Sequence, residues 1–81
     1  MPTPSPSHAG DPVLVAMGGA IRNARKVKGL SQESLAAESG IERAYMSGIE
    51  RGMQNMSLMT LAKVAKALGI SVADLVVEAR I

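Results

Sequence analysis

A glycine between two short amphipathic segments is the feature that most constrains how this chain folds. The stretch from Gln32 to Arg51 reads QESLAAESGIERAYMSGIER. On both sides of Gly40 its apolar residues recur at about the 3.6-residue period of a helix. Glycine adopts positive φ without a Cβ penalty, so Gly40 suits an abrupt end of the first segment. The stretch therefore predicts two short helices joined by a tight turn.

Two helices joined in this way form a helix-turn-helix, whose second helix can enter the DNA major groove. The face of the second helix that packing does not need is small and polar, and carries Arg43, Ala44, Ser47, Gly48 and Arg51. Arg43 stands in the first turn, the part of a recognition helix that reaches base edges. The alternative is an ordinary antiparallel helix pair with no role in DNA binding.

The start of the first of these helices offers a second contact with DNA. Gln32 lies there, and its amide and the adjoining free backbone N–H groups point where a phosphate could sit. Upstream, four cationic residues cluster within one short segment, Arg22, Arg25, Lys26 and Lys28. This cluster indicates either a surface for a negatively charged partner or only a solvated helix face.

Helix signals in the rest of the chain favour an all-α fold, a compact five-helix bundle. Asp11-Pro12 is typical of an N-cap and first turn, and opens a helix to about Lys28. Gly18-Gly19 interrupts it, either because the helix starts weakly or because a neighbour packs closely there. The remaining predicted N-caps are Ser31, Glu42, Ser57 and Ser71. The fourth helix should bury one stripe, formed by Leu58, Leu61, Val64, Ala65 and Leu68.

The chain of 81 residues has room for one small domain. Residues 1–10, rich in Pro, Ser and Thr, are expected to be a disordered tail. Residues 11–81 are expected to form a helix-turn-helix DNA-binding domain, with the motif itself at 32–51 and a dimerisation helix at the C-terminal end. That last helix is more apolar than one buried side requires, and its candidate interface residues are Val72, Val76, Val77 and Ile81.

The composition argues against an enzyme. The chain has no Cys and one His, His8, which falls in the expected tail, and its carboxylates are scattered over separate predicted helices. We therefore expect no catalytic residues, no metal, no cofactor and no small-molecule ligand. No apolar run approaches the ~20 residues of a membrane span, and a signal peptide is not evident. A cytoplasmic protein without a membrane partner is expected.

From about Ile21 to Leu75 the chain resembles the lambda-repressor-like helix-turn-helix family, also called the Cro/C1 or xenobiotic-response-element type. The matching stretches are IRNARKVKGLSQESLA, SGI, SGIERG and LAKVAKALGIS. Within that family, ERAYMSGIERGMQN is similar to a stretch of restriction–modification controller proteins, which are small dimeric regulators of their own and neighbouring genes. The resemblance implies a transcriptional regulator, bound as a homodimer to a palindromic operator in double-stranded DNA. An antitoxin, a phage-type repressor, or a helical protein-interaction adaptor that does not use DNA are the alternatives.

The resemblance also implies roles for individual residues. Arg43 would contact a base, while Gln32, Tyr45 and Arg51 would contact the DNA backbone, or in the case of Tyr45 a base. Backbone N–H groups around Gln54 and Asn55 would approach phosphate. The full set of candidate DNA-binding residues is Gln32, Arg43, Ala44, Tyr45, Ser47, Gly48, Arg51, Gln54 and Asn55.

Other implied or alternative roles are structural. Arg25 and Glu50 fall where the family places a salt bridge between the first and third helices. Tyr45 could instead pack its ring against the helix pair, and Arg51 could interact only with the carbonyl end of its own helix. Ala44 stands where controller proteins often carry Thr, Glu42 replaces the capping Asp, and Gln54 lies where some of them have Arg. These departures leave the operator sequence open.

Overall fold

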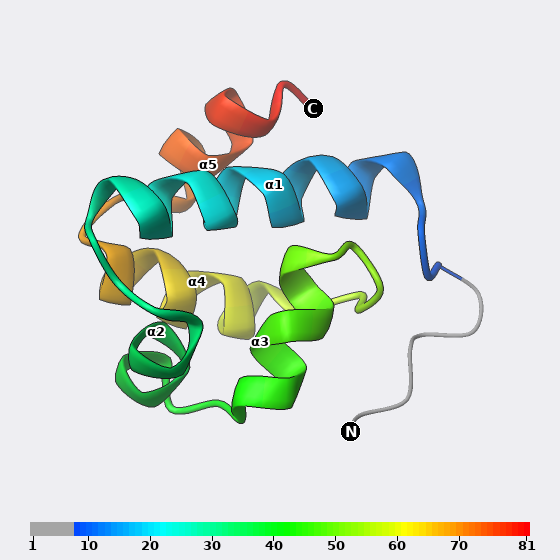
Figure 1. Cartoon of the computed structure of the whole chain (residues 1–81). Coiled ribbons are helices and arrows are strands. Elements are labelled where there is room, and N and C mark those ends of the chain that lie inside the picture. The colour runs from blue at the N-terminus through cyan, green and yellow to red at the C-terminus, as the bar shows by residue number, and fades with distance from the viewer. Residues whose placement is uncertain (1–7) are drawn as a thin grey trace.

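The computed structural model describes residues 8–81, and five α-helices account for most of them (Figure 1). The helices are α1 (Pro12–Val27), α2 (Gln32–Ser39), α3 (Arg43–Glu50), α4 (Leu58–Leu68) and α5 (Val72–Ala79). No strand occurs within residues 8–81, and the predicted all-α bundle is confirmed.

Side-chain caps begin four of the five helices. The carboxylate of Asp11 and the hydroxyls of Ser31, Ser57 and Ser71 each accept a backbone N–H of the following turn at 2.9–3.1 Å. Such caps satisfy N–H groups that the helix itself leaves without partners. The exception is α3, because Glu42 makes no side-chain cap hydrogen bond.

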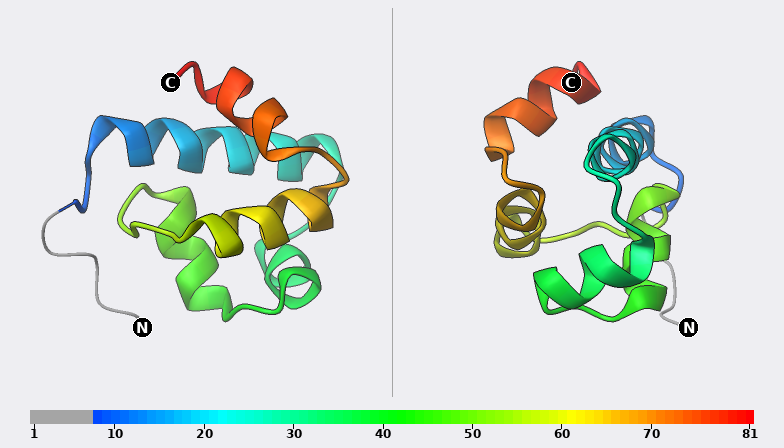
Figure 2. Two further views of the ribbon diagram at one scale, coloured as in Figure 1. Left: turned by 180° about the vertical axis from the view of Figure 1, so that it is seen from behind. Right: turned by 60° about the vertical axis from the view of Figure 1, so that its left-hand side comes forward.

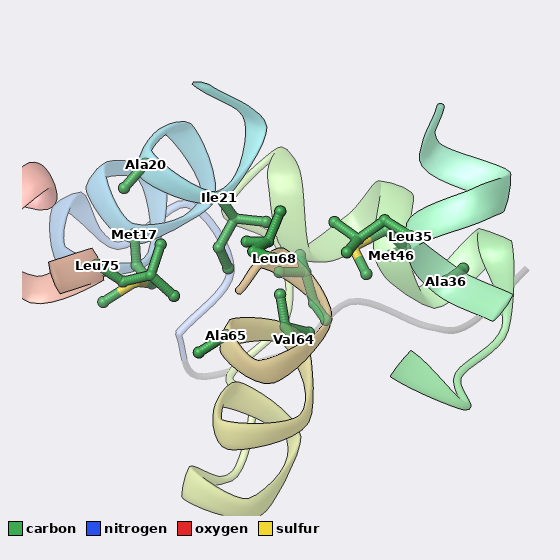
Figure 3. Packing of buried hydrophobic residues seen from close by; sticks show 11 residues of the cluster. Met17, Ala20, Ile21, Leu35, Ala36, Met46, Val64, Ala65, Leu68 and Leu75 are labelled. Carbon is green, nitrogen blue, oxygen red and sulfur yellow. The ribbon is translucent and has the colours of Figure 1, made fainter. Parts of the chain in front are cut away.

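The helices wrap around one aliphatic core. The long helix α1 contacts α3, α4 and α5, while α2 packs on α3 and α4. Figures 1 and 2 show α5 lying against α1 on the side away from α2 and α3. In Figure 3, Leu35 and Met46 gather between α2 and α3, and Met17 and Leu75 gather between α1 and α5. The buried apolar residues are Met17, Ala20, Ile21, Leu35, Ala36, Met46, Ile49, Val64, Ala65, Leu68 and Leu75.

Close packing explains the first of the two adjacent glycines in α1. A Cβ added to Gly18 would lie 2.7 Å from the carbonyl oxygen of Glu50, nearer than real Cβ atoms approach. Gly19, by contrast, has nothing within 4 Å of such an atom. Of the two explanations that the sequence leaves open, the close neighbour is therefore the correct one. The missing side chain at Gly18 lets α1 rest directly on the C-terminal end of α3.

Residues 8–10 differ from the expected tail. They form a turn in which the Gly10 N–H donates to the Gly52 carbonyl at 2.8 Å, and the Asp11 N–H donates to the His8 carbonyl at 2.9 Å. These residues are thus tied to the end of α3, whereas the remainder of the expected tail, residues 1–7, lies outside the described residues.

Leu58 also differs from its expected place in the buried stripe of α4. Its side chain is 72% exposed, while Val64, Ala65 and Leu68 are buried. Leu58 is the first residue of α4, and no neighbouring element in residues 8–81 covers this first turn. Helical periodicity identified the correct face but not the point along it where the core begins.

Two serines at opposite ends of α2 provide a test of this local structure. The buried hydroxyl of Ser39 has no hydrogen-bond partner among the described residues, whereas Ser31 caps the helix. Ser39→Ala should raise the free energy of unfolding by about 0.5–1 kcal/mol, since a buried hydroxyl without a partner is destabilising and alanine favours helix. Ser31→Ala, the matched control, should lower it by about 1 kcal/mol. Thermal melts measure both, and a loss of stability in Ser39→Ala would mean that its hydroxyl has a partner.

Candidate nucleic-acid interface

The turn between α2 and α3 is built as the sequence predicts. Gly40 has φ of 70°, and the Ile41 N–H donates to the Ala36 carbonyl at 3.0 Å. This closure of the helix end is available because glycine tolerates the left-handed conformation. Ile41 then packs against the core, which fixes the direction in which α3 leaves the turn.

The structure brings four of the candidate DNA-binding residues together. Gln32 of α2 and Arg43, Ala44 and Ser47 of α3 line one open hollow of about 400 Å³. Arg43 is exposed, and the other three are half-buried. Because α3 has no side-chain cap, its first turn leaves Arg43 beside free N–H groups at a positive helix end, which favours an anionic partner.

Gly48 is not on this surface, contrary to expectation. It is buried, and a Cβ added to it would meet Cγ of Gln54 at 2.9 Å. Gln54 itself is only 8% exposed. The missing side chain at Gly48 therefore makes room for Gln54 to pack against α3. Asn55, the next residue, is exposed.

Tyr45 and Arg51 occupy places that agree with the structural alternatives as well as with DNA contact. Tyr45 is half-buried and packs against the core. Arg51 is exposed, and its Nε donates to the Ser47 carbonyl at 3.4 Å, near the carbonyl end of α3. Neither side chain lines the hollow that Arg43 shares with Gln32.

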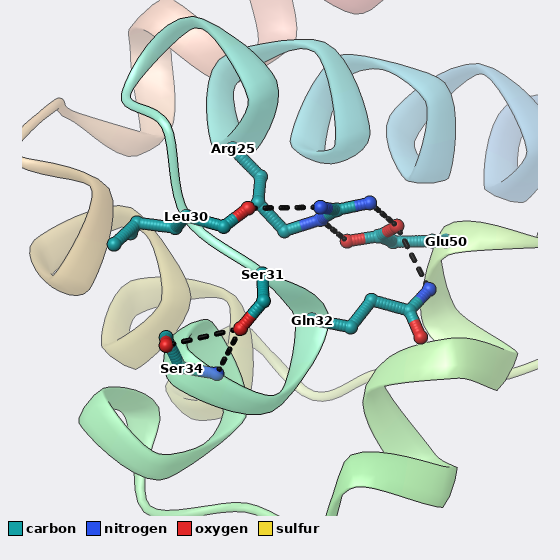
Figure 4. Close-up of polar contacts among 6 residues, drawn as sticks. All are labelled: Arg25, Leu30, Ser31, Gln32, Ser34 and Glu50. Atoms are coloured by element: carbon teal, nitrogen blue, oxygen red, sulfur yellow. Dashed lines mark hydrogen bonds and ion pairs between the residues drawn. The ribbon is translucent and has the colours of Figure 1, made fainter.

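A polar network ties α1, α2 and α3 together beneath this surface (Figure 4). Arg25 binds Glu50 in bidentate fashion, with Nε to Oε2 at 2.7 Å and Nη2 to Oε1 at 3.0 Å. Arg25 Nη1 also donates to the Leu30 carbonyl at 2.9 Å. The hydrogen bond to Glu50 raises the pKa of Arg25; burial opposes this shift and the charge of the carboxylate adds to it. The guanidinium is therefore held charged.

Gln32 joins the same network, which the sequence did not predict. Its Nε2 donates to Glu50 Oε1 at 3.1 Å. The two residues are eighteen positions apart, and no periodicity within either helix indicates that they meet. The side-chain amide that was expected to face a phosphate is thus anchored in part to a buried carboxylate.

The basic cluster of α1 does not form one surface. Arg25 forms an ion pair with Glu50, and Lys28 donates to the Ala67 carbonyl at 3.0 Å near the end of α4. Arg22 and Lys26 are exposed. Cations at carbonyl ends of helices are stabilising, so at least half of this cluster has a structural use.

The candidate dimer residues divide into two pairs. Val72 and Val76 are half-buried and pack against the core of their own chain. Val77 and Ile81 are 75% and 51% exposed. Fewer apolar side chains of this region are therefore exposed than the sequence predicts, and those that are exposed lie on the outer side of α5.

The described residues carry neither a membrane span nor a metal-binding cluster. Within residues 8–81 no helix is both long and apolar enough to cross a bilayer. The same residues hold no group of three or more His, Asp or Glu side chains placed to bind a metal ion.

Comparison with known proteins identifies the family. A family model described as helix-turn-helix matches residues 21–75. Control protein C.MunI of Mycoplasma sp is 41% identical over 64 residues, which cover 78% of this chain and 86% of that protein. The crystal structure of the restriction-modification controller protein C.AhdI from Aeromonas hydrophila matches with a TM-score of 0.75 and 48% identity, over 76% of this chain and 94% of that one. The clp gene regulator ClgR from Corynebacterium glutamicum matches with a TM-score of 0.81 and 41% identity, over 84% and 88%.

The relatives are regulators and control proteins, and the motif that defines the family is the one whose geometry is described above. The chain therefore belongs to the helix-turn-helix family of the Cro/C1 type and is a DNA-binding transcriptional regulator, not an enzyme.

Proposed function

We propose that this regulator binds a palindromic operator as a homodimer and controls its own transcription, as a restriction–modification controller protein. The observation that carries the proposal is the hollow on α3, where exposed Arg43 stands beside Ala44, Ser47 and Gln32. A guanidinium fork matches guanine O6 and N7, and small neighbours let the helix approach the base edges. The similarity to control proteins supports the subfamily.

The other proposed contacts are made mainly with the sugar–phosphate backbone of the DNA. Gln32 and Arg51 contact phosphates at the two ends of the motif, and Tyr45 contacts the backbone or a base. Asn55 is exposed, and backbone N–H groups around it contact a further phosphate. The protein acts in the cytoplasm, where its operator is accessible.

The test is binding to the DNA upstream of the protein's own gene. An inverted repeat there should bind tightly, with log K falling linearly as log salt rises because neutralised phosphates release counterions. A scrambled duplex of equal length is the control. Equal binding to both duplexes would rule out sequence-specific regulation, and the absence of salt-sensitive binding would favour the adaptor alternative. A regulator of genes other than its own remains the second candidate, supported by the similarity to ClgR.

Dimerisation is expected through the outer side of α5. A twofold axis at Val77 and Ile81 would place the two Arg43 side chains about 34 Å apart, one turn of DNA. Val77→Asp should weaken the dimer by at least about tenfold, since it buries a charge in an apolar interface. Val27→Asp is the matched control, because Val27 is 89% exposed on α1. Sedimentation at tens of micromolar measures both, and a wild-type chain that sediments as a monomer would contradict the proposal.

A further inference from the structure

Glu50 accepts more hydrogen bonds than its ion pair requires. Its side chain is only 2% exposed, and Arg25 alone satisfies both of its oxygens. Oε1 nevertheless accepts a third hydrogen bond, at 3.1 Å, from Gln32 at the start of α2 (Figure 4). The third bond comes from a residue on the DNA-facing hollow, whereas Arg25 comes from the opposite side of the carboxylate.

The negative charge of Glu50 determines which way the Gln32 amide faces. An ionised carboxylate only accepts hydrogen bonds, and a glutamine amide has an acceptor end and a donor end. With the amide reversed, Gln32 Oε1 would lie against Glu50 Oε1, and the two oxygens would repel. The donor end must therefore face Glu50, and in Figure 4 the amide oxygen points away from it, toward α3.

Arg25 keeps this arrangement in place. Arg25 binds Glu50 in bidentate fashion and also donates a hydrogen bond to the Leu30 carbonyl. These bonds fix the Glu50 carboxylate relative to α1 and to the loop that leads into α2. Gln32 follows that loop directly. The position and the orientation of its amide are thus set from α1 and α3 together.

We propose that Glu50 is a positioning residue for DNA binding, which holds the Gln32 amide in one orientation on the DNA-facing surface. One N–H of the Gln32 amide donates to Glu50. Its second N–H and its oxygen therefore face the DNA in a fixed orientation. Ordering this side chain in advance spares the complex the entropy that immobilising it would otherwise require. The inference rests on the proposed function, in which Gln32 contacts the DNA.

A double-mutant cycle on operator binding tests the proposal. Gln32→Ala should weaken binding by about two- to tenfold, as loss of a neutral hydrogen bond does. Glu50→Gln should also weaken binding by about two- to tenfold, because a neutral partner accepts either orientation of the Gln32 amide. In the Gln32→Ala background, Glu50→Gln should cause no further loss. Equal losses in both backgrounds would overturn the proposal, and so would an absence of any effect of Gln32→Ala on operator binding by a wild-type chain that does bind.

The sign of the effect separates positioning from net charge. Glu50→Gln removes one negative charge, which by itself strengthens the attraction of the protein for DNA. Glu38→Gln is the matched control, since Glu38 is exposed on α2 and the change in charge is the same. Glu38→Gln should therefore bind as tightly as wild type or more tightly, while Glu50→Gln binds more weakly. Glu50→Gln binding as tightly as Glu38→Gln would overturn the proposal.

Hydrogen exchange in the wild-type chain provides a further test. It requires neither DNA nor a folded Glu50→Gln variant. One Nε2–H of Gln32 should exchange at least about tenfold more slowly than the side-chain amide protons of exposed Asn23. NMR measures both in one sample. Equal rates would show that Gln32 is not held, even if Glu50→Gln does not fold. Slow exchange in a chain that binds no DNA would retain the hydrogen bond but overturn the DNA-binding function on which its role depends.

Discussion

Glu50→Ala should lower the free energy of unfolding by about 3–5 kcal/mol, because removing one partner of a buried ion pair leaves the other charged and desolvated. Arg25 would lose both bonds to the carboxylate and keep only the bond to the Leu30 carbonyl. Small domains have a total stability of about 5–15 kcal/mol, so this loss is a large part of it. The melting temperature should fall steeply, and DNA binding should fall at least as far as the folded fraction does.

Chemical denaturation followed by circular dichroism measures this loss. Glu38→Ala serves as the control, since it also removes a carboxylate but from an exposed position, and should change stability by about 0.5 kcal/mol or less. If Glu50→Ala has the same free energy of unfolding as the wild type, the ion pair adds no stability. The raised pKa of Arg25 gives the sign of the pH dependence: the contribution is complete below the pKa of an unfolded arginine and is lost only as the pH rises through the folded one. Across neutral pH it should therefore stay constant.

Arg43→Ala and Arg51→Ala should separate base reading from backbone contact. Arg43→Ala should weaken operator binding by about 1–3 kcal/mol and relax preference at one base pair per half-site. Arg51→Ala should weaken operator and scrambled DNA alike, and reduce the slope of log K against log salt by about one for each phosphate that the protein no longer neutralises. Both side chains are exposed at opposite ends of the same short helix, and each substitution removes one positive charge.

Titrations at several salt concentrations, on operator and on scrambled duplex, measure the difference. Arg22→Ala is the control, because Arg22 is an exposed arginine on α1 and its removal changes the net charge equally. If Arg43→Ala weakens both duplexes equally with a shallower salt slope, Arg43 binds phosphate. The sequence would then be read by Tyr45 or through deformation of the DNA. If neither substitution changes binding, α3 is not the DNA surface.

The sequence alone determined the helices and their ends. Caps such as Ser31 and Ser57, and the turn at Gly40, depend on hydrogen bonds and backbone conformations within a few residues, and local sequence contains that information. The pattern of apolar residues in α4 likewise placed Val64, Ala65 and Leu68 in the core. Arg25 and Glu50 were paired from the resemblance to a family, not from their spacing.

Only the tertiary structure decided how the helix faces meet. Gly18 rests on the end of α3, Gly48 lies beneath Gln54, and Leu58 is exposed. The same holds for Gln32, whose amide binds a carboxylate eighteen residues away instead of standing free at a helix end. Each of these outcomes depends on which residues from distant segments come within a few ångströms. Periodicity specifies which side of a helix is buried. It does not specify how closely a neighbouring helix approaches, or which residue of that helix a given side chain contacts.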